Sequence, residues 1–547
     1  MRGASLALCA AVTVLAGVTG ADTRFAVRIG LQPDWSGRSH RPEGGSSGPG
    51  EARDPDGASL AADETEVRPP AVAGRFYPAD AATLRRAVDT LLTHARPTVA
   101  RDVVALVVPH AGYPFSGQIA ADAFAYLKEG GPDVVILLGA NHTAPPVRGV
   151  AVHPGRAFRT PMGEVAIDRD LASALVRSGG GVVADASPHR DEHSIEVQLP
   201  FVQVLAPRAR VVPVIVGTRD PDETARFGRT LATLLAGRRA LVVASSDLSH
   251  YPAARDAVEI DHETLDAFAA FAASRLAARE RQAETVTTPG LATRACGLGP
   301  ALVAMSAARA LGAARATVVS YANSGDTAVG DPDRVVGYGA VAYHRDIARS
   351  APDAFEPASR PAAGPPSAAE KRALLALARG TFTQFLESET LPLPRDVPSE
   401  SNGRRQGAFV TLKEGGQLRG CIGRIVHDGP LPQLVSMVAF EAAFRDARFR
   451  PLARQELDRV EVEISLLTPP RTVGSARDIV VGRDGVILRK GGRSAVFLPQ
   501  VATEQRWGRD QMLDELCVKG GLPRQCWTAG AELATFQADV FGETGHR

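Results

Sequence analysis

Five short runs of aliphatic residues limit the folds that the first two thirds of the chain can adopt. Each run is rich in valine and is apolar along most of its length rather than at every second position. Strands that are covered on both faces have this composition, because neither face meets water. The five runs are VVALVV (103–108), VVILLG (134–139), VVPVIVG (211–217), ALVVAS (240–245) and ATVVSY (316–321).

Helical patterns separate these runs. Amphipathic or alanine-rich stretches such as DETARFGRTLATLLAG and GLGPALVAMSAARALG lie between the predicted strands. Alternation of strands with helices is typical of a parallel sheet with helices packed on its faces. We therefore expect an α/β domain, layered around a largely parallel sheet.

The last third of the chain has a different pattern, which indicates a smaller α+β domain. EKRALLALARGTFTQFLES predicts a helix, and GAFVTLKEGGQLRGCIGRI predicts two strands that are joined at a glycine pair. VEVEISLLTPP and GVILRKGGRSAVFLPQ alternate as further strands, whereas LPQLVSMVAFEAAF and EQRWGRDQMLDELCVKGG predict helices.

Segments of biased composition divide the 547 residues. The apolar leader at the start is either a secretory signal peptide or else a misassigned start or an unstructured extension. Two later segments are rich in Gly, Pro, Ser and charge and cannot bury enough apolar surface to order themselves. The predicted organisation is a leader (1–21), a disordered segment (22–66), the α/β domain (67–347), a linker (348–368) and the α+β domain (369–547).

Charge and cysteine content exclude several classes of protein. Sixty-two basic residues balance 61 acidic residues, so no net field favours nucleic acid or an anionic membrane. Beyond the leader, no apolar run approaches the roughly 18 residues that a membrane-spanning helix needs. Five widely spaced cysteines without a CxxC pair predict neither a disulfide framework nor a zinc finger.

Polar side chains that can bind metal follow three of the predicted strands directly. His110 comes two residues after VVALVV, His142 comes three residues after VVILLG, and Asp247 with His250 follows ALVVAS. The carboxyl ends of parallel strands lie at one edge of a sheet, where ligands of open α/β sheets bind. We therefore expect these side chains to converge.

Cys296 is a fourth candidate ligand, because it directly precedes a predicted helix whose N-terminus favours a thiolate. Two imidazoles with one anionic ligand suit non-haem iron, and sulfur also admits copper or zinc. Taken singly, a loop histidine is more often a hydrogen-bonded residue, and a buried cysteine more often a small apolar one. His193, Glu192 and Glu196 in DEHSIEVQLPF are either partners that orient a ligand of this site or a charged helix start.

In the last third, the stretch LRGCIG presents Arg419 and Cys421 between glycines. These residues are either a binding or reactive-thiol site on a tight turn, or packed residues in a strand whose geometry the glycines serve. Arg419 is also suited to hold an anionic group. The nearby stretch AAFRDARFRP predicts a solvated, salt-bridged turn after a helix.

These motifs, in their order and spacing, resemble two known families. VAGRFYPAD, PHAGYPFSG, LLGANHT, DEHSIEVQLPF, SSDLSHY, the Cys296 segment, YANSGD and VGYGA resemble the Memo family over residues 67–345. GAFVTL, LRGCIG, AAFRDARFRPL, VEVEISLL and LPQVATEQRW resemble the AMMECR family over residues 369–545. Bacterial members of both families occur with a radical-SAM enzyme in the AmmeMemoRadiSam system, sometimes fused as here.

The resemblance to the Memo family implies the fold of class III extradiol dioxygenases. It also implies that His110, His142 and Cys296 bind a mononuclear metal ion, with Asp247, His250 and His193 lining the same pocket. The metal expected is iron, with copper and zinc as alternatives. A cysteine stands where the dioxygenases use a carboxylate, and this difference argues against ring cleavage.

The sequence thus leads to one main hypothesis and two alternatives. The main hypothesis is a metal-dependent redox or dioxygenase-like protein that acts on a small molecule or a protein, with a radical-SAM partner. The alternatives are a non-catalytic module that binds a peptide or a modified side chain, and a zinc hydrolase with Asp247 or Glu192 as base. A partner with an iron–sulfur cluster favours the cytoplasm, whereas a cleaved leader (1–21) would imply export.

Overall fold

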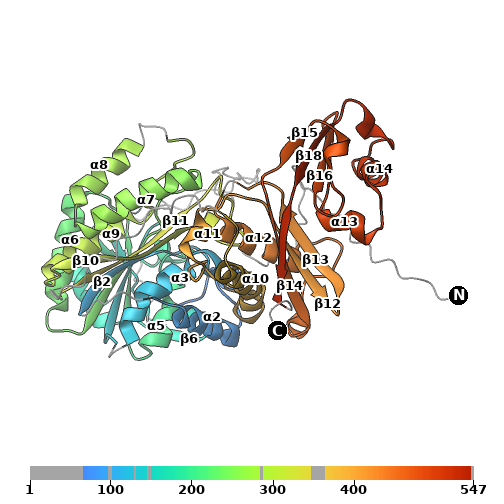
Figure 1. Cartoon of the computed structure of the whole chain (residues 1–547). Coiled ribbons are helices and arrows are strands. Elements are labelled where there is room, and N and C mark those ends of the chain that lie inside the picture. The colour runs from blue at the N-terminus through green and yellow to red at the C-terminus, as the bar shows by residue number, and fades with distance from the viewer. Residues whose placement is uncertain are drawn as a thin grey trace, which may run out of the picture. The chain divides into compact units, whose positions relative to one another are not determined.

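The computed structural model describes residues 66–96, 102–128, 131–144, 147, 149–283, 288–345, 364–427 and 429–543 (Figure 1). The predicted leader, the predicted disordered segment and most of the predicted linker lie outside these residues. Two compact units are present and are described separately. The first comprises the described residues up to Asn323 with those from Asp333 to 345, and the second comprises Ser324–Pro332 with the described residues from 364.

The first unit is built on a mixed eight-stranded sheet with the strand order β10-β11-β2-β9-β3-β8-β4-β7. Its four middle strands, β2, β9, β3 and β8, are parallel, as the continuous apolar runs predict. The strands are β2 (Val103–Val108), β3 (Val134–Gly139), β4 (Val150–Val152), β7 (Val182–Ala184), β8 (Arg210–Val216), β9 (Ala240–Ser245), β10 (Arg315–Asn323) and β11 (Gly337–His344).

Helices cover this sheet on both sides. Figure 1 shows α3 and α5 on one side of the sheet and α6 and α9 on the other. The helices are α2 (Ala81–Thr93), α3 (Tyr113–Phe124), α4 (Arg169–Arg177), α5 (Leu199–Leu205), α6 (Pro221–Leu235), α7 (Ala254–Ala269), α8 (Ala273–Ala283) and α9 (Leu298–Ala310). Short 3₁₀ turns of this unit are η1 (Ala125–Lys128), η2 (Ser187–His189) and η3 (Glu196–Gln198), and a small sheet contains β1 (Val67–Arg68), β5 (Ala157–Thr160) and β6 (Gly163–Ala166). The turn η4 (Ser324–Asp326) belongs to the second unit.

Strand β10 differs from its prediction. The run ATVVSY predicts a strand covered on both faces, but β10 lies at the edge of the sheet, antiparallel to β11. Its residues from Ala316 to Tyr321 are all partly exposed. Threonine, serine and tyrosine interrupt the apolar run and tolerate this position, so a short run cannot distinguish an inner strand from an edge strand.

The second unit contains two four-stranded antiparallel sheets, in the orders β13-β12-β14-β19 and β15-β18-β16-β17. The strands are β12 (Ala408–Glu414), β13 (Gln417–Arg424), β14 (Val460–Leu467), β15 (Arg471–Val473), β16 (Gly485–Lys490), β17 (Arg493–Phe497), β18 (Glu532–Phe536) and β19 (Ala538–Gly542). The helices are α10 (Ala368–Ser388), α11 (Ser399–Asn402), α12 (Leu431–Phe444), α13 (Pro499–Glu504) and α14 (Arg509–Lys519), with 3₁₀ turns η5 (Arg454–Glu456), η6 (Ala476–Asp478) and η7 (Cys526–Thr528).

Local signals explain where these elements begin and turn. Ser367 caps α10 through its side chain, and Glu370 returns a hydrogen bond to the backbone of Ser367. Gly415 and Gly416 join β12 to β13 with φ angles of 56° and 77°. Two consecutive positive φ angles are required by the tightest hairpin turns, and glycine adopts them without strain.

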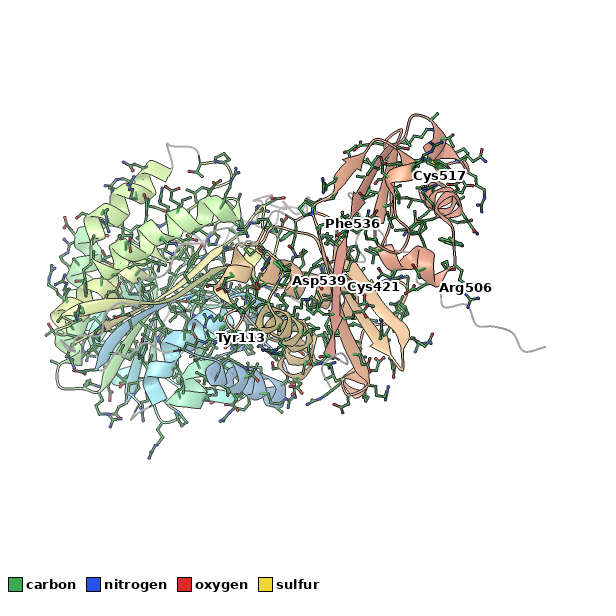
Figure 2. The ribbon with its side chains drawn as sticks, viewed as in Figure 1. Tyr113, Cys421, Arg506, Cys517, Phe536 and Asp539 are labelled. Carbon is green, nitrogen blue, oxygen red and sulfur yellow. A yellow bond between two sulfur atoms is a disulfide. The ribbon has the colours of Figure 1, made fainter. Side chains whose placement is uncertain are left out.

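The second unit also holds a disulfide bond between Cys517 in α14 and Cys526 in η7 (Figure 2). The cysteine pattern did not predict it, because the spacing of nine residues matches no recognised framework. Among the described residues, Cys296 and Cys421 are not part of a disulfide bond. No helix in the described part of the chain is both long and apolar enough to cross a bilayer.

Candidate metal centre

The predicted site residues of the first unit lie beyond the ends of neighbouring parallel strands. His110 follows β2, His142 follows β3, and Asp247 with His250 follows β9. Strand β9 lies between β2 and β3 in the sheet. Because the three strands point in the same direction, their following loops meet at one edge.

Cys296 reaches this edge from the segment before α9, and glycine makes the approach possible. A Cβ atom on Gly297 would lie 2.2 Å from the carbonyl oxygen of Ser245 and 2.6 Å from the Cβ atom of Ser246. Only glycine avoids this clash. As a result, Sγ of Cys296 lies 3.2 Å from Nε2 of His110.

Three imidazole rings gather around the same point. The ring centroid of His110 lies 5.0 Å from that of His142 and 5.3 Å from that of His193, and the last two are 4.9 Å apart. Two groups offer ligand atoms that lie within 4.8 Å of one another, namely His110 with His142 and His193, and His110 with Asp247 and Cys296. His142 also hydrogen-bonds to Cys296. The structure therefore brings the three predicted ligands together, with His193 and Asp247 beside them.

Ser245 determines which nitrogen of His110 carries the proton. The hydroxyl of Ser245 donates its one proton to the carbonyl oxygen of Ser194, at 2.7 Å, and it accepts a hydrogen bond from Nε2 of Gln198, at 2.9 Å. Nδ1 of His110, 3.0 Å from the same hydroxyl, must therefore be the donor. Nε2 of His110 then has a free lone pair directed toward Cys296, as a metal ligand requires.

Glu192 has the same role for His142. Its buried carboxylate accepts hydrogen bonds from Nδ1 of His142 at 3.0 Å and from the backbone N–H groups of His142, His193 and Ser194 at 2.7 to 2.9 Å. Burial alone would raise the pKa of Glu192, but these hydrogen bonds and the nearby histidines lower it well below its usual range. The ionised carboxylate keeps the Nδ1 proton on His142 and orients the ring, so that Nε2 is the atom that would bind a metal ion.

The electrostatics of the ligands suit a cation. Burial, followed by the neighbouring His142 and His193, lowers the pKa of His110 well below its usual value, so that this imidazole is neutral. Burial raises the pKa of the Cys296 thiol. Burial lowers the pKa of His142, but hydrogen bonds to Cys296 and Glu192 outweigh this effect and raise it overall. A metal ion would displace these protons, and two nitrogen donors with one sulfur donor suit iron, copper or zinc.

Asp247 and His250 lie around these ligands. Asp247 is 4% exposed, accepts a 2.7 Å hydrogen bond from the backbone N–H of His110, and places its other oxygen 3.9 Å from Nε2 of His110. Burial raises the pKa of Asp247 to about 7. His250 belongs to neither ligand group, but its Nδ1 donates to the carbonyl oxygen of Leu248 at 3.0 Å, which leaves Nε2 unprotonated.

A buried ion pair anchors the loop that carries Glu192 and His193. Arg68 pairs with Glu196 and also donates to the carbonyl oxygens of His189 and Glu192. The hydroxyl of Tyr77 donates to Glu196 at 2.5 Å. The two glutamates are therefore not simply a charged helix start. Glu192 orients His142, and Glu196 anchors the loop through Arg68. No sequence signal pointed to Ser245 or Gln198 as residues that orient His110.

In the second unit, Cys421 is buried in β13 (Figure 2). Arg419 lies on the same strand. The backbone N–H of Cys421 donates to Asp446, and its carbonyl oxygen accepts from Arg448, both at 2.9 Å. Arg419 pairs with Glu456 at 2.7 and 3.1 Å. The stretch AAFRDARFRP is therefore not simply a solvated turn, because Asp446 is only 6% exposed and holds Cys421 in place.

Comparison with known proteins agrees with this geometry. Residues 68–342 match the model of the Memo-like protein family. The chain is 38% identical over 282 residues to a MEMO1 family protein of Methanosarcina mazei, a match that covers 50% of this chain and 98% of that protein. The chain belongs to the Memo-like protein family. A MEMO1 family protein of Aquifex aeolicus is also 38% identical, over 273 residues that cover 97% of its length.

The second unit matches a different family. Residues 375–541 of this Memo-like protein match the AMMECR1 family model, so the chain is a fusion of the two domains. The crystal structure of an uncharacterized protein from Pyrococcus horikoshii shares 36% sequence identity over 32% of this chain and 91% of that protein, with a TM-score of 0.30. The family assignments confirm the two resemblances seen in the sequence.

Proposed function

We propose that the Memo-like unit binds one metal ion through His110, His142 and Cys296 and supports redox or oxygenase-like chemistry on a small molecule or a protein side chain. The observation that carries this proposal is the pair of oriented imidazoles. Ser245 and Glu192 hold the Nδ1 protons of His110 and His142, which turns the Nε2 side of both rings toward the thiol. The donor set favours iron, and copper or zinc are the alternatives.

When bound, the metal would supply a Lewis acid and a redox centre. The protein's own residues then position the reactants. Asp247 is placed to hold or release a proton at Oδ2, and His250 can accept one at Nε2. The ring of Phe76 lies beside that of His193, with the centroids 4.8 Å apart and the planes tilted by 50°.

The first test measures metal content. Three purified full-length proteins are compared: the parent, the His110→Ala variant and a His262→Ala control. Each is loaded with Fe²⁺ in the absence of oxygen and desalted, and its metal content is measured by elemental mass spectrometry. His262 is a partly exposed residue of α7. The parent protein and the control should retain one metal ion per chain, and His110→Ala should lose it. Retention of most of the metal in His110→Ala would refute the assignment.

The second test separates catalysis from binding. Iron-loaded protein is exposed to oxygen with a panel of catechols and thiols, and oxygen uptake is recorded. Turnover that disappears in Cys296→Ala supports the enzyme. Absence of turnover, together with saturable binding of a peptide, would instead support a recognition module with the same pocket.

The expected partner is a radical-SAM enzyme of the same system. The fusion of a Memo-like unit with an AMMECR1 unit supports this proposal, because it resembles the fused arrangement of that system. Co-expression followed by affinity purification tests it directly. Failure of the two proteins to associate, with or without S-adenosylmethionine, would contradict the partnership and leave the metal assignment unaffected.

A further inference from the structure

His193 lies at the metal centre, although it is not one of the three ligands proposed above. The centroid of its ring is 5.3 Å from that of His110 and 4.9 Å from that of His142, and these two rings are 5.0 Å apart. The ligand atoms that the three residues offer lie within 4.8 Å of one another. The three imidazoles therefore form a nearly regular triangle around a common point.

These separations match those of three imidazoles that bind one metal ion. Imidazole nitrogen binds zinc at about 2.0 to 2.1 Å, so three rings on one ion, at angles between octahedral and tetrahedral, have centroids roughly 4.5 to 5.3 Å apart. All three of the observed distances fall within this range. A histidine that only lined the pocket would not have to meet this condition.

The ring of His193 is also held with its Nε2 atom available. Nδ1 of His193 lies 3.4 Å from Oε1 of Glu192, and the same oxygen atom accepts from Nδ1 of His142 at 3.0 Å. The ionised carboxylate favours a proton on both Nδ1 atoms. Nε2 of His193 makes no hydrogen bond with the residues that the structure describes. One glutamate thus prepares two imidazoles to bind a metal ion.

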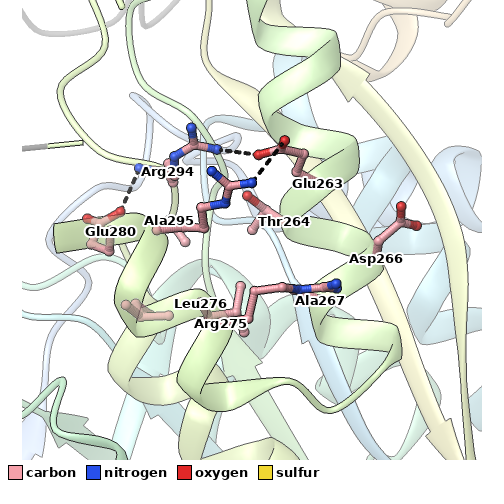
Figure 3. Close-up of a pocket in the computed structure, with 11 residues that line it drawn as sticks. Glu263, Thr264, Asp266, Ala267, Arg275, Leu276, Glu280, Arg294 and Ala295 are labelled. Atoms are coloured by element: carbon pink, nitrogen blue, oxygen red, sulfur yellow. Dashed lines mark hydrogen bonds and ion pairs between the residues drawn. The ribbon is translucent and has the colours of Figure 1, made fainter. Parts of the chain in front are cut away.

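The thiol of Cys296 is positioned by contacts that do not involve the histidines. Figure 3 shows how the segment before it is held: Glu280 accepts from the backbone N–H of Arg294 at 2.9 Å, and the side chain of Arg294 pairs with Glu263 at 3.1 Å. With this segment fixed, Sγ of Cys296 lies 3.2 Å from Nε2 of His110. The sulfur donor and the imidazoles are thus placed independently of one another and still meet.

Asp247 is the other side chain to consider as a fourth ligand, because it forms a group with His110 and Cys296. One of its oxygen atoms already accepts from the backbone N–H of His110 at 2.7 Å, and the other lies 3.9 Å from Nε2 of His110. The carboxylate is therefore tied to the backbone of one ligand. Nε2 of His193 has no such partner within the described residues, which makes it the better donor.

We propose that His193 is a fourth protein ligand, so that the centre holds its ion with three imidazoles and one thiolate. This inference rests on the proposed function for the presence of a metal ion. Catalytic zinc keeps three protein ligands and one water molecule, whereas zinc with four protein ligands is closed. The fourth ligand thus excludes the zinc hydrolase alternative, whereas an ion that accepts further ligands, such as iron, keeps positions for a reactant.

The test counts the histidine ligands of full-length protein by proton NMR, with Co²⁺ as a paramagnetic probe that is loaded in the absence of oxygen. An imidazole bound through Nε2 keeps its Nδ1 proton, which gives a strongly shifted signal in H₂O that is lost in D₂O. We expect three such signals. Two signals would refute the role of His193 and would leave the assignment of His110, His142 and Cys296 in place.

Variants identify the third histidine. His193→Ala should lose one signal, and its affinity for Co²⁺, measured by chelator competition, should fall by more than the roughly 10- to 100-fold that the loss of an orienting partner costs. His250→Ala is the matched control, because His250 lies at the same edge but belongs to neither ligand group. It should keep all three signals. Equal Co²⁺ affinity of His193→Ala and the parent protein would overturn the proposal.

The sulfur ligand is followed separately, through the absorption band of a thiolate bound to Co²⁺. At saturating Co²⁺, this band should persist in His193→Ala and disappear in Cys296→Ala. Its loss from saturated His193→Ala would contradict an added ligand, because the ion would then have left the thiol as well. The absence of every shifted signal and of the band from the parent protein would refute the proposed metal centre itself, a result distinct from a count of two.

Discussion

Cys296 and Cys421, the described cysteines outside the disulfide bond, lie in different chemical surroundings. Cys296, in the first unit, lies 3.2 Å from Nε2 of His110 and also hydrogen-bonds to His142. Cys421, in the second unit, is held by Asp446 and Arg448, which are also paired with each other. The first thiol belongs to a group of side chains that could hold a metal ion, whereas the thiol of Cys421 accepts a hydrogen bond from the hydroxyl of Thr411 at 3.3 Å.

The largest expected effect is a complete difference between the two thiols. Cys296→Ala should abolish metal binding, because it removes the only sulfur donor at the centre, whereas Cys421→Ala should retain full metal content. Elemental analysis of both variants after loading checks this. Loss of metal from Cys421→Ala, in a folded protein, would show that the second unit also contributes to metal binding.

The disulfide of the second unit has no counterpart in the described part of the first. Cys517→Ser with Cys526→Ser should destabilise the second unit by about 2 to 3 kcal/mol, because the bond closes a short loop and restricts the unfolded chain. Differential scanning calorimetry of the full chain should show one transition at lower temperature and one unchanged. A shift of both transitions by the same amount would contradict the separation of the two units.

Replacing a hydrogen-bond partner of a metal ligand should weaken metal binding less than replacing the ligand itself. Glu192→Gln should weaken metal affinity about 10- to 100-fold, because the amide cannot keep the proton on Nδ1 of His142 as firmly. Glu456→Gln, which alters the corresponding partner of Arg419 in the second unit, is the matched control and should have no effect. Competition titration with a chelator measures both, and equal affinities would refute the orienting role of Glu192.

The smallest effect concerns a carboxylate in the second unit. Burial alone would raise the pKa of Glu370, but hydrogen bonds from Arg404, from the backbone of Ser367 and from Ser401 outweigh it and lower the pKa to about 2. Because the folded value lies below the ordinary one of 4.5, the stabilisation is complete above pH 4.5 and is lost as the pH falls toward 2.

Between pH 4.5 and about pH 3, the second unit should therefore lose about 1 to 2 kcal/mol through Glu370. Urea unfolding of the full chain, followed by the signals of each unit, measures this loss. Glu370→Gln should flatten the dependence of the second unit on pH over this range. An unchanged slope in the variant would assign the acid sensitivity to other groups.

Several parts of the fold followed from local patterns in the sequence. Continuous apolar runs identified β2, β3, β8 and β9 as covered strands, and the glycine pair at 415–416 marked the hairpin between β12 and β13. Residues that directly follow parallel strands lie at the carboxyl edge of the sheet. His110, His142 and Asp247 could therefore be placed at one edge from their positions in the sequence. These inferences need only the residues next to one another in the chain.

What only the tertiary structure decided depends on partners that are far apart in the sequence. Ser245 orients His110, which lies 135 positions away in the sequence, and Gln198 hydrogen-bonds to Ser245 from 47 positions away. Gly297 packs directly against the end of β9, where any larger residue would clash. The edge position of β10 and the Cys517–Cys526 bond were likewise not readable from local pattern. The spacing of apolar residues in the sequence indicates which faces of a helix or strand are covered. A hydrogen bond between side chains that are distant in the sequence produces no such pattern. The protonation of the candidate ligands could therefore be worked out only from the folded structure.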